Sequence, residues 1–313
     1  MSKTLIVDAD TLLYSSAAQQ QENKCRAIHK ASGRDKLFES KTAFNTWLKS
    51  QEKWNKDEFE FQTESNVVGE PRFAFQAIKQ KVEKIFNASY CDDFILCIEG
   101  EGNFRKQYET PYVQYKANRT EKPILFEECR EFFQKKYKNK VILSVGRETD
   151  DTCNIFAWES YNKALSTRNK GNAPYVIAYV DKDIVANGRG FMLNYNKLEE
   201  GVFWNDSLSQ TRKFFAQCLQ GDNADNIPGI KFLADTTKER YGISVKGVGP
   251  ATVDRILGEC KTEKEMGDAV VQCYREAYPE DWWQRLQDNA FFLYLQRKEN
   301  DVFQLDEFLG GLK

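Results

Sequence analysis

The chain has 313 residues, of which 41% are hydrophobic and 13% aromatic, and its formal net charge at pH 7 is −2. This composition supports a packed core and excludes wholesale disorder, and the lack of a long apolar run or an export signal favours a cytoplasmic protein that is not inserted in a membrane. The single histidine, His29, excludes Ser-His-Asp catalysis and histidine-rich metal sites, and eight cysteines without a C-x-x-C pair are expected to be reduced core thiols.

An apolar strand at about residues 4–9 opens the chain and leads into Asp8. A helix is predicted over 11–19, and it carries Tyr14. Residues 20–69 lose the rhythm of strands and helices and turn polar, so we expect a helical insertion there. Pro71 suits the first turn of the next helix, which is predicted because the apolar residues after it recur at helical spacing.

Three further strands are predicted, and each also ends in carboxylates. The apolar runs 94–98, 141–145 and 175–180 alternate with helices, which implies an α/β fold with a mainly parallel central sheet flanked by helices. The carboxyl ends of such strands converge on one crevice, so the acids there would share a pocket. These acids are Asp8, Glu99, Glu148, Asp150, Asp151, Asp181 and Asp183.

So many carboxylates in one pocket need a counter-charge, because each raises the pKa of its neighbours. Mg²⁺ and Mn²⁺ prefer oxygen ligands, and the pattern therefore predicts a metal-dependent phosphodiester enzyme. The alternative is that residues 148–151 are only a charged first helical turn, where acids favour the helix dipole, and that Asp10 is only a helix cap.

Residues 105–140 are locally basic, with ten Lys or Arg against five Asp or Glu. Such a segment beside an acidic pocket is typical of a protein that binds a phosphate backbone together with metal ions. Within it, Lys116 and Arg119 are candidates for neutralising charge that develops on a scissile phosphate. A solvated basic helix face is the alternative.

A small hairpin is predicted over 190–204, and no strand is expected from Ser207 onward. We therefore divide the chain into an α/β domain, 1–206, and a helical region, 207–313. Residues 221–229 form a second acidic cluster with Asp222 and Asp225, for which a turn with Asx caps is the alternative. Residues 246–252, K-G-V-G-P-A-T, resemble the glycine hairpin of helix–hairpin–helix modules, whose backbone N–H groups bind DNA phosphate, although an ordinary helix start would look similar.

In this order, the motifs resemble those of the flap endonuclease/5′→3′ exonuclease family. They are D-x-D near the start, N-F-R followed by Y-K-A-N-R, E-x-D-D, D-K-D, and G-D-x-x-D-N-I-P-G followed by G-V-G-P-A-T. The chain looks most like the free-standing phage branch and is similar to the 5′-nuclease domain of family-A DNA polymerases. The resemblance implies a PIN-like or resolvase-like fold, a helical arch at 105–140 and a helix–hairpin–helix (helix–three-turn–helix) region at about 221–258.

The resemblance also implies roles for individual residues. The first of two metal ions would be held by Asp8, Glu99, Glu148 and Asp150. The second would be held or surrounded by Asp151, Asp181, Asp183, Asp222 and Asp225. The catalytic cations on the arch would be Lys116 and Arg119, assisted by Arg105. The residues expected to contact DNA are Tyr14, Tyr115, Lys122, Lys246, Gly247, Gly249 and Thr252, with a core tyrosine as the alternative for Tyr14.

Three features depart from the family pattern. Family members usually have Asp where this chain has Glu99, whose longer side chain could change how the first metal sits. Residues 231–245 are inserted between the two glycine motifs, which could alter the binding of duplex DNA or of K⁺ at the hairpin. The segment 20–69 has no counterpart in the family pattern, so its role is open.

The resemblance implies a Mg²⁺-dependent 5′→3′ exonuclease or flap endonuclease, with Mn²⁺ as a substitute ion. It would act on DNA near 5′ ends or flaps and on RNA in RNA–DNA hybrids during replication or recombination, with a replicative polymerase or a single-strand-binding protein as partners. Two alternatives are a PIN-like ribonuclease acting on structured RNA and a DNA-end-binding protein without catalytic activity. The glycine hairpin favours DNA, and the intact set of acids argues against a pure binding protein, because anions facing phosphate would weaken binding.

Overall fold

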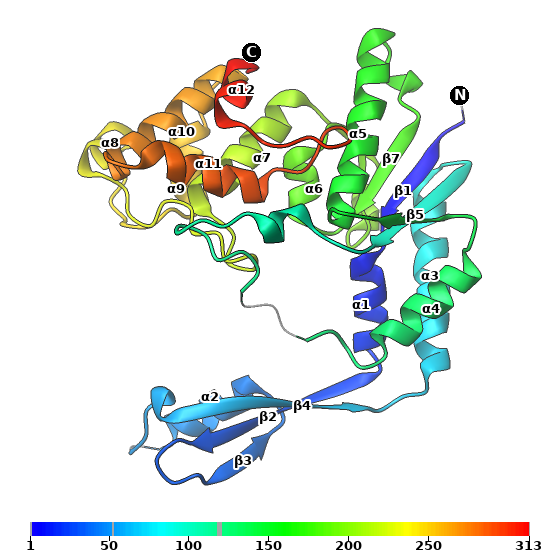
Figure 1. Cartoon of the computed structure of the whole chain (residues 1–313), viewed down its shortest axis with the longest axis vertical. Helices are drawn as coiled ribbons and strands as arrows, with labels where there is room; N and C mark the ends of the chain where they lie inside the picture. Colours follow the sequence, from blue (N-terminus) through cyan, green and yellow to red (C-terminus); the bar gives the residue numbers. More distant parts are fainter. Residues whose placement is uncertain (1, 52, 118–120, 313) are drawn as a thin grey trace. The chain divides into compact units, whose positions relative to one another are not determined.

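The computed structural model describes residues 2–51, 53–117 and 121–312, which form two compact units. The first unit comprises Met1–Asp10, Glu83–Thr120 and Asn139–Lys313, and the second comprises Thr11–Val82 and Glu121–Lys138. Figure 1 labels the helices and strands of both units. None of the described helices combines the length and the apolarity needed to cross a bilayer.

A six-stranded sheet organises the described part of the first unit, in the order β6-β5-β1-β7-β8-β9. All neighbouring strands are parallel except β8 and β9, which form an antiparallel hairpin. The mainly parallel sheet predicted from the sequence is therefore confirmed. The strands are β1 (Thr4–Asp8), β5 (Asp93–Glu99), β6 (Val141–Ser144), β7 (Tyr175–Tyr179), β8 (Gly190–Asn194) and β9 (Phe203–Asn205).

The order of the strands reverses once at the carboxyl edge of the sheet, and we call this reversal point the crevice. From β1 the chain moves outward through β5 to β6, and it then returns to add β7 and β8 on the other side of β1. Ligands of doubly wound sheets bind at such a reversal, which here lies between the ends of β1 and β7. Helix α5 (Thr149–Ser166) packs beside β7 (Figure 1), and its Cys153 and Ala157 are buried with Ile6 and Ile177 of the sheet.

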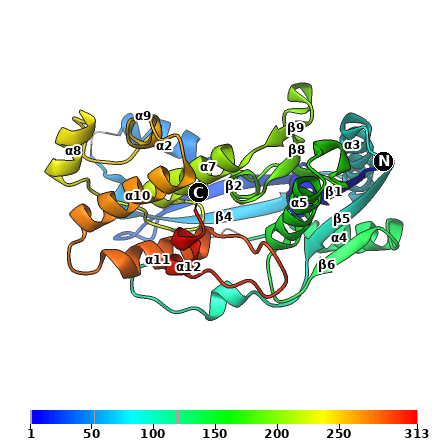
Figure 2. The same ribbon diagram turned by 90° about the horizontal axis from the view of Figure 1, so that it is seen from above.

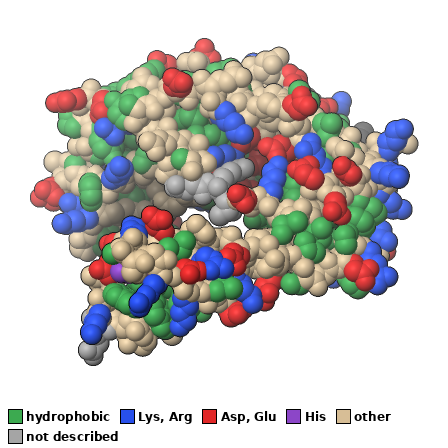
Figure 3. All heavy atoms as spheres, turned by 60° about the horizontal axis from the view of Figure 1, so that its bottom comes forward, with side chains coloured by type: hydrophobic (Ala, Val, Ile, Leu, Met, Phe, Trp, Pro, Cys, Tyr) green, Lys and Arg blue, Asp and Glu red, His purple; other side chains and the backbone are tan. Residues whose placement is uncertain are grey.

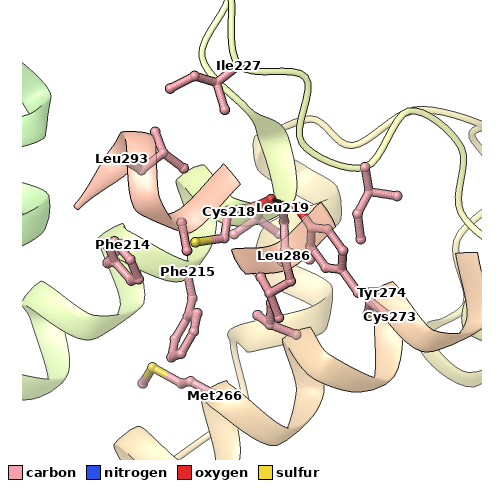
Figure 4. Close-up of a cluster of buried hydrophobic side chains, with 14 of the residues drawn as sticks. Phe214, Phe215, Cys218, Leu219, Ile227, Met266, Cys273, Tyr274, Leu286 and Leu293 are labelled. Atoms are coloured by element: carbon pink, nitrogen blue, oxygen red, sulfur yellow. Dashed lines mark hydrogen bonds between the residues drawn. The ribbon is translucent and has the colours of Figure 1, made fainter. Parts of the chain in front are cut away.

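The rest of the first unit is helical beyond β9, as the sequence pattern predicted. Helix α10 packs against α7, and α11 contacts both α7 and α12 (Figure 2). Figure 4 shows the core of this region, where Phe214, Phe215, Met266, Tyr274 and Leu286 are buried together. The helices beyond β9 are α7 (Ser207–Gln220), α8 (Asp235–Tyr241), α9 (Pro250–Leu257), α10 (Glu263–Ala277), α11 (Trp282–Leu293) and α12 (Leu305–Gly310), whereas α6 (Lys182–Asn187) lies between β7 and β8.

The expected helical insertion at residues 20–69 is wrong, because strands hold more of its described residues than helices do. Its strands form an antiparallel sheet in the order β3-β2-β4, with helix α2 packed on one face. Cys25 and Phe59 face the buried cluster beside Phe44 of α2, whereas Arg26 on the other face pairs with Glu64 across the strands. The bounds are β2 (Gln21–His29), β3 (Asp35–Phe38), α2 (Lys41–Lys49) and β4 (Phe59–Val67).

The expected arch at 105–140 also differs from the prediction. Residues 108–117 contain no helix, and within the described part of this segment the helices are the short 3-10 helix η2 (Phe104–Gln107) and α4 (Phe126–Lys136). These two parts belong to different compact units.

The remaining helices are α1 (Asp10–Ala18) and α3 (Pro71–Ser89), with 3-10 turns η1 (Lys56–Glu58), η3 (Lys170–Asn172) and η4 (Leu198–Glu200). On the face drawn in Figure 3, acidic and basic side chains are interspersed.

Candidate active site

Three carboxylates from different elements meet at the crevice. Asp8 ends β1 and is only 2% exposed, Asp150 lies in the first turn of α5, and Asp181 caps α6 directly after β7. Burial, and then the nearby charges of Asp10 and Asp181, raise the pKa of Asp8 well above its usual range. Burial, Asp8 and Asp181 do the same for the pKa of Asp150. The side chains are therefore close enough to repel one another when ionised.

A second group of acids adjoins the first through Asp183. Burial, and then Asp181, raise the pKa of Asp183 to about 7, with smaller contributions from Asp222 and Asp225 and an opposing hydrogen bond from Gln217. Asp222 forms an ion pair with Lys182, with 2.8 Å between Lys182 Nζ and Asp222 Oδ2. The two acids of the 221–229 loop thus lie beside those that follow β7.

Glu148 differs from these acids, because a cation and hydrogen-bond donors contact its carboxylate. Its carboxylate pairs with Lys116 Nζ and accepts hydrogen bonds from Asn103 Nδ2 at 2.7 Å and from Tyr115 Oη at 3.0 Å. Burial alone would raise the pKa of Glu148, but Lys116 and Arg105 lower it to about 2. Lys116 Nζ also lies 3.5 Å from Asp225 Oδ2. The ammonium of Lys116 therefore links two acids that are far apart in the sequence.

Arg105 was expected to assist catalysis and Asp151 to hold or surround the second metal, but the structure pairs the two residues with each other. Both side chains are inaccessible to solvent. Arg105 donates from Nη1 to Asp151 Oδ2 at 2.6 Å and from Nη2 to Oδ1 at 2.8 Å, and it also donates to the carbonyl oxygen of Tyr294. Asp151 further accepts the backbone N–H groups of Glu148 and Gln296. A fork-to-fork pair of this kind ties η2 to α5, and it leaves neither residue exposed to a substrate or an ion.

Asp10 has a larger part in the site than the sequence indicated. The structure begins α1 at Asp10, whose two carboxylate oxygens accept the N–H of Glu99 at 3.0 Å each and the hydroxyl of Thr149. The residue therefore joins the ends of β1 and β5 to the start of α5. The D-x-D spacing of Asp8 and Asp10 was the available signal, but a helix cap explained it equally well.

The residues expected to contact DNA are distributed over both units. In the second unit, Tyr14 is 41% exposed on α1, and Lys122 Nζ lies 4.5 Å from the ring centroid of Phe126. In the first unit, the ring of Tyr115 stacks on that of Phe292, with 4.7 Å between the ring centroids, and its hydroxyl donates to Glu148. Arg119, the second predicted catalytic cation, lies outside the described residues.

The glycine hairpin precedes α9 and is mostly at the surface. Lys246 and Gly247 are exposed, and Gly249 caps α9, whereas Thr252 is buried in the helix. The inserted segment 231–245 contains α8, so a helix, a hairpin and a second helix follow one another here. The buried side chain of Thr252 is therefore not available for the predicted contact with DNA.

The 221–229 loop is closed by its two end glycines. Asp222 and Ile227 exchange N–H···O hydrogen bonds of 2.8 Å, and Asp222 Oδ1 accepts the N–H of Ala224 at 2.8 Å. Both Gly221 and Gly229 have left-handed φ angles, 75° and 59°. A Cβ on Gly229 would lie 2.3 Å from the backbone nitrogen of Gly221, which real structures do not tolerate.

We expect Gly229→Ala to lower the free energy of unfolding by roughly 2 kcal/mol or more, because both the φ angle and the backbone contact oppose a Cβ. The matched control is Gly247→Ala, where an added Cβ meets no atom within 4 Å. Urea unfolding followed by circular dichroism measures both variants. Equal midpoints for the two variants would contradict this account of the loop.

The donor set at the crevice suits a hard divalent cation. It consists of carboxylate oxygens, and within residues 2–51, 53–117 and 121–312 no Lys or Arg forms an ion pair with Asp8, Asp150 or Asp181. In the same residues, no three His, Cys, Asp or Glu side chains stand close enough together to hold one ion as they are oriented.

Comparisons with known proteins give the following similarities. No protein family and no curated protein matches the sequence. Among solved structures, a bacteriophage T5 D15 flap endonuclease variant in a pseudo-enzyme-product complex with DNA and metal ions aligns with TM-score 0.41 and 11% identity, over 98% of this chain and 97% of that chain. T5 D15 protein co-crystallized with metal ions aligns with TM-score 0.42 and 11% identity over the same shares.

Proposed function

We propose that this protein is a divalent-metal-dependent 5′ nuclease that hydrolyses phosphodiester bonds of DNA near 5′ ends or flaps. One observation carries the proposal: the buried Asp8 of β1, the half-buried Asp150 of α5 and the exposed Asp181 after β7 converge at the reversal point of a parallel sheet. Their mutual repulsion, together with burial, raises the pKa of Asp8 and of Asp150. A bound cation would relieve that cost, and phosphate is the substrate group that such an ion serves.

The proposed ions are Mg²⁺, with Mn²⁺ as a substitute, held by Asp8, Asp150 and Asp181 and flanked by Glu99, Asp183, Asp222 and Asp225. When bound, such ions supply an activated water and stabilise charge on the leaving oxygen. The nearby protein groups have separate tasks. Asp10 fixes the backbone of Glu99 and the start of α5, and Gln217 orients Asp183.

Lys116 is the proposed positively charged group at the phosphate. Its ammonium already lies between the carboxylates of Glu148 and Asp225, so these two residues would hold it beside the acids of the crevice. Tyr115 and Asn103 fix Glu148 from the other side. Charge that develops on the phosphate during cleavage would be partly neutralised there. Arg119 is proposed as its companion from the sequence motif alone.

DNA contacts are proposed for the surface hairpin before α9, where Lys246, Gly247 and Gly249 offer a cation and backbone N–H groups. A K⁺ ion at this hairpin, cleavage of RNA in RNA–DNA hybrids, a role in replication, and a polymerase or single-strand-binding protein as partner are extensions of the same proposal. They rest on the motif resemblance.

A time course with 5′-labelled substrates tests the proposed function. We expect Mg²⁺ to support cleavage of 5′-flap and nicked DNA and of the RNA strand of a hybrid, and a chelator to stop it. Single-stranded RNA of the same length is the comparison substrate. Cleavage of that RNA without cleavage of flap DNA would favour a structure-specific ribonuclease. Binding of flap DNA without cleavage in any divalent ion would favour a DNA-end-binding protein.

A further inference from the structure

A cavity of about 520 Å³ lies in the first unit, and Asp8, Asp150 and Asp181 are not among its lining residues. Its walls come from α5, from the starts of α7 and α10, and from α12. Three basic residues line it, Arg189, Lys261 and Arg297, but only one acid does, Glu263. A cavity of this size is in the range of small-molecule sites, and its excess of positive charge suits an anion.

Arg297 is the unusual member of the lining. Its guanidinium stacks near three rings, with Cζ 4.4 Å from the centroid of Trp158, 5.2 Å from Tyr294 and 5.0 Å from Phe308. Its Nε is buried without a hydrogen-bond partner, and the charges of Asp301 and Glu263 act on its guanidinium, although among the described residues neither acid forms an ion pair with it. Burial lowers the pKa of this guanidinium, and the charge of Arg189 adds to that effect. An anion in the cavity would satisfy both the charge and the missing hydrogen bond.

Arg189 faces the same indole ring as Arg297. Its Cζ is 4.8 Å from the Trp158 centroid. Its N–H groups donate hydrogen bonds to Gln210 at 2.9 Å, to Thr211 at 3.3 Å and to Glu263 at 2.7 Å. Glu263 forms an ion pair with Arg189, whereas within the described residues neither Arg297 nor Lys261 forms one. A phosphate monoester, with a charge of about −1.5 to −2 at pH 7, matches these two cations better than a single carboxylate does.

The remaining lining suits the body of a nucleotide. Tyr161 and Phe308 add aromatic surface, while Leu165 and Leu208 are 56% and 42% exposed at the cavity. The indole of Trp158 is fixed by its Nε1–H, which donates to the carbonyl oxygen of Asn187 at 3.0 Å. A planar base with a sugar fits such mixed aromatic and aliphatic walls, because bases stack on rings and on guanidinium planes.

We propose that this cavity binds a nucleotide through its terminal phosphate monoester, with the phosphate on Arg297 and Lys261 and the base against the aromatic walls. The ligand could come from two sources, a free mononucleotide or the phosphorylated end of a DNA strand. The proposal does not depend on nuclease activity, because the cavity and the acidic crevice use different residues.

Calorimetric titration of the full chain in a chelating buffer tests this site. The probes are 2′-deoxyadenosine 5′-monophosphate, deoxyadenosine, inorganic phosphate, and a short oligonucleotide with or without a 5′-phosphate. We expect the mononucleotide to bind at least about tenfold more tightly than deoxyadenosine or phosphate alone, because both parts of the ligand contribute. The phosphorylated oligonucleotide identifies the source: tighter binding than the mononucleotide indicates a strand end, and weaker binding indicates a free nucleotide.

Arg297→Gln should weaken mononucleotide binding at least about tenfold, which corresponds to the loss of one charged hydrogen-bonding partner. Its matched control is Lys298→Gln, which removes the same charge from an exposed neighbour outside the cavity. Because Arg297 stacks on three rings, Lys261→Gln at the exposed rim provides a second variant that should fold, with a threefold or greater loss expected. Wild-type affinity in both cavity variants, or equal affinity for the mononucleotide and inorganic phosphate, would overturn the proposal.

Discussion

Asp181→Asn should lower the rate of 5′-flap cleavage at least about a thousandfold, which is about 4 kcal/mol of activation free energy, while DNA binding stays the same or becomes slightly tighter. The substitution keeps the shape of the side chain but removes one of the charges that converge with Asp8 and Asp150. The proposed metal ion would lose one of its carboxylate ligands, whereas DNA would meet one anion fewer. Single-turnover cleavage in Mg²⁺ and fluorescence anisotropy in a chelator measure the two effects.

The same variant should be more stable than the wild type when metal ions are removed. Burial, and then Asp10 and Asp181, raise the folded-state pKa of Asp8, so Asp8 binds its proton more tightly in the folded than in the unfolded protein. Stability is therefore lost as the pH rises through the folded pKa, and removal of the Asp181 charge reduces that loss. We expect a higher Tm than the wild type at pH 7 in a chelator, and a smaller difference at pH 4.

The control for both measurements is Asp268→Asn, which removes an equal charge from a side chain that is 68% exposed and pairs with Lys264 on α10. We expect wild-type cleavage and a Tm within about 1 °C, because exposed pairs contribute little. Near-normal flap cleavage by Asp181→Asn would remove this residue from the proposed metal site. An unchanged Tm at pH 7 would mean that the carboxylates do not repel one another as the structure indicates.

Arg105→Met should lower the free energy of unfolding by about 3–5 kcal/mol, because it leaves the carboxylate of Asp151 buried without a counter-charge. Arg105 is the largest of the fully buried side chains in the described residues, and its guanidinium donates hydrogen bonds to Asp151 and to the carbonyl oxygen of Tyr294. Arg105→Lys should recover only part of the loss, because an ammonium cannot bind both carboxylate oxygens in the same geometry. Urea unfolding measures all three proteins.

Two comparisons separate this structural role from a catalytic one. The double variant Arg105→Met/Asp151→Leu should be more stable than Arg105→Met alone, because no charge is left buried. Lys106→Met changes the exposed neighbour and should unfold like the wild type. If Arg105→Met instead unfolds like the wild type but cleaves DNA poorly, Arg105 would act on the substrate, as the sequence motif implied.

The sequence by itself determined the framework of the molecule. Apolar runs such as 5–7 and 176–180 predicted strands, and their alternation with helices predicted a parallel sheet, which the pairing of β1 with β5 and β7 confirms. The geometry of a parallel sheet then brings every strand end to one edge. For this reason, the meeting of Asp8, Asp150 and Asp181 could be anticipated without coordinates.

Tertiary structure alone decided what the individual acids do. Local sequence treats Asp150 and Asp151 alike, but a helix turns by about 100° per residue, so one faces the crevice and the other faces Arg105. The role of Asp10 could not be predicted from local sequence either, because its partners Glu99 and Thr149 are 89 and 139 residues away. The insertion at 20–69 was misjudged because its half-buried strands carry paired charges such as Arg26 and Glu64 on one face, and only the partner strand makes those polar positions compatible with a sheet.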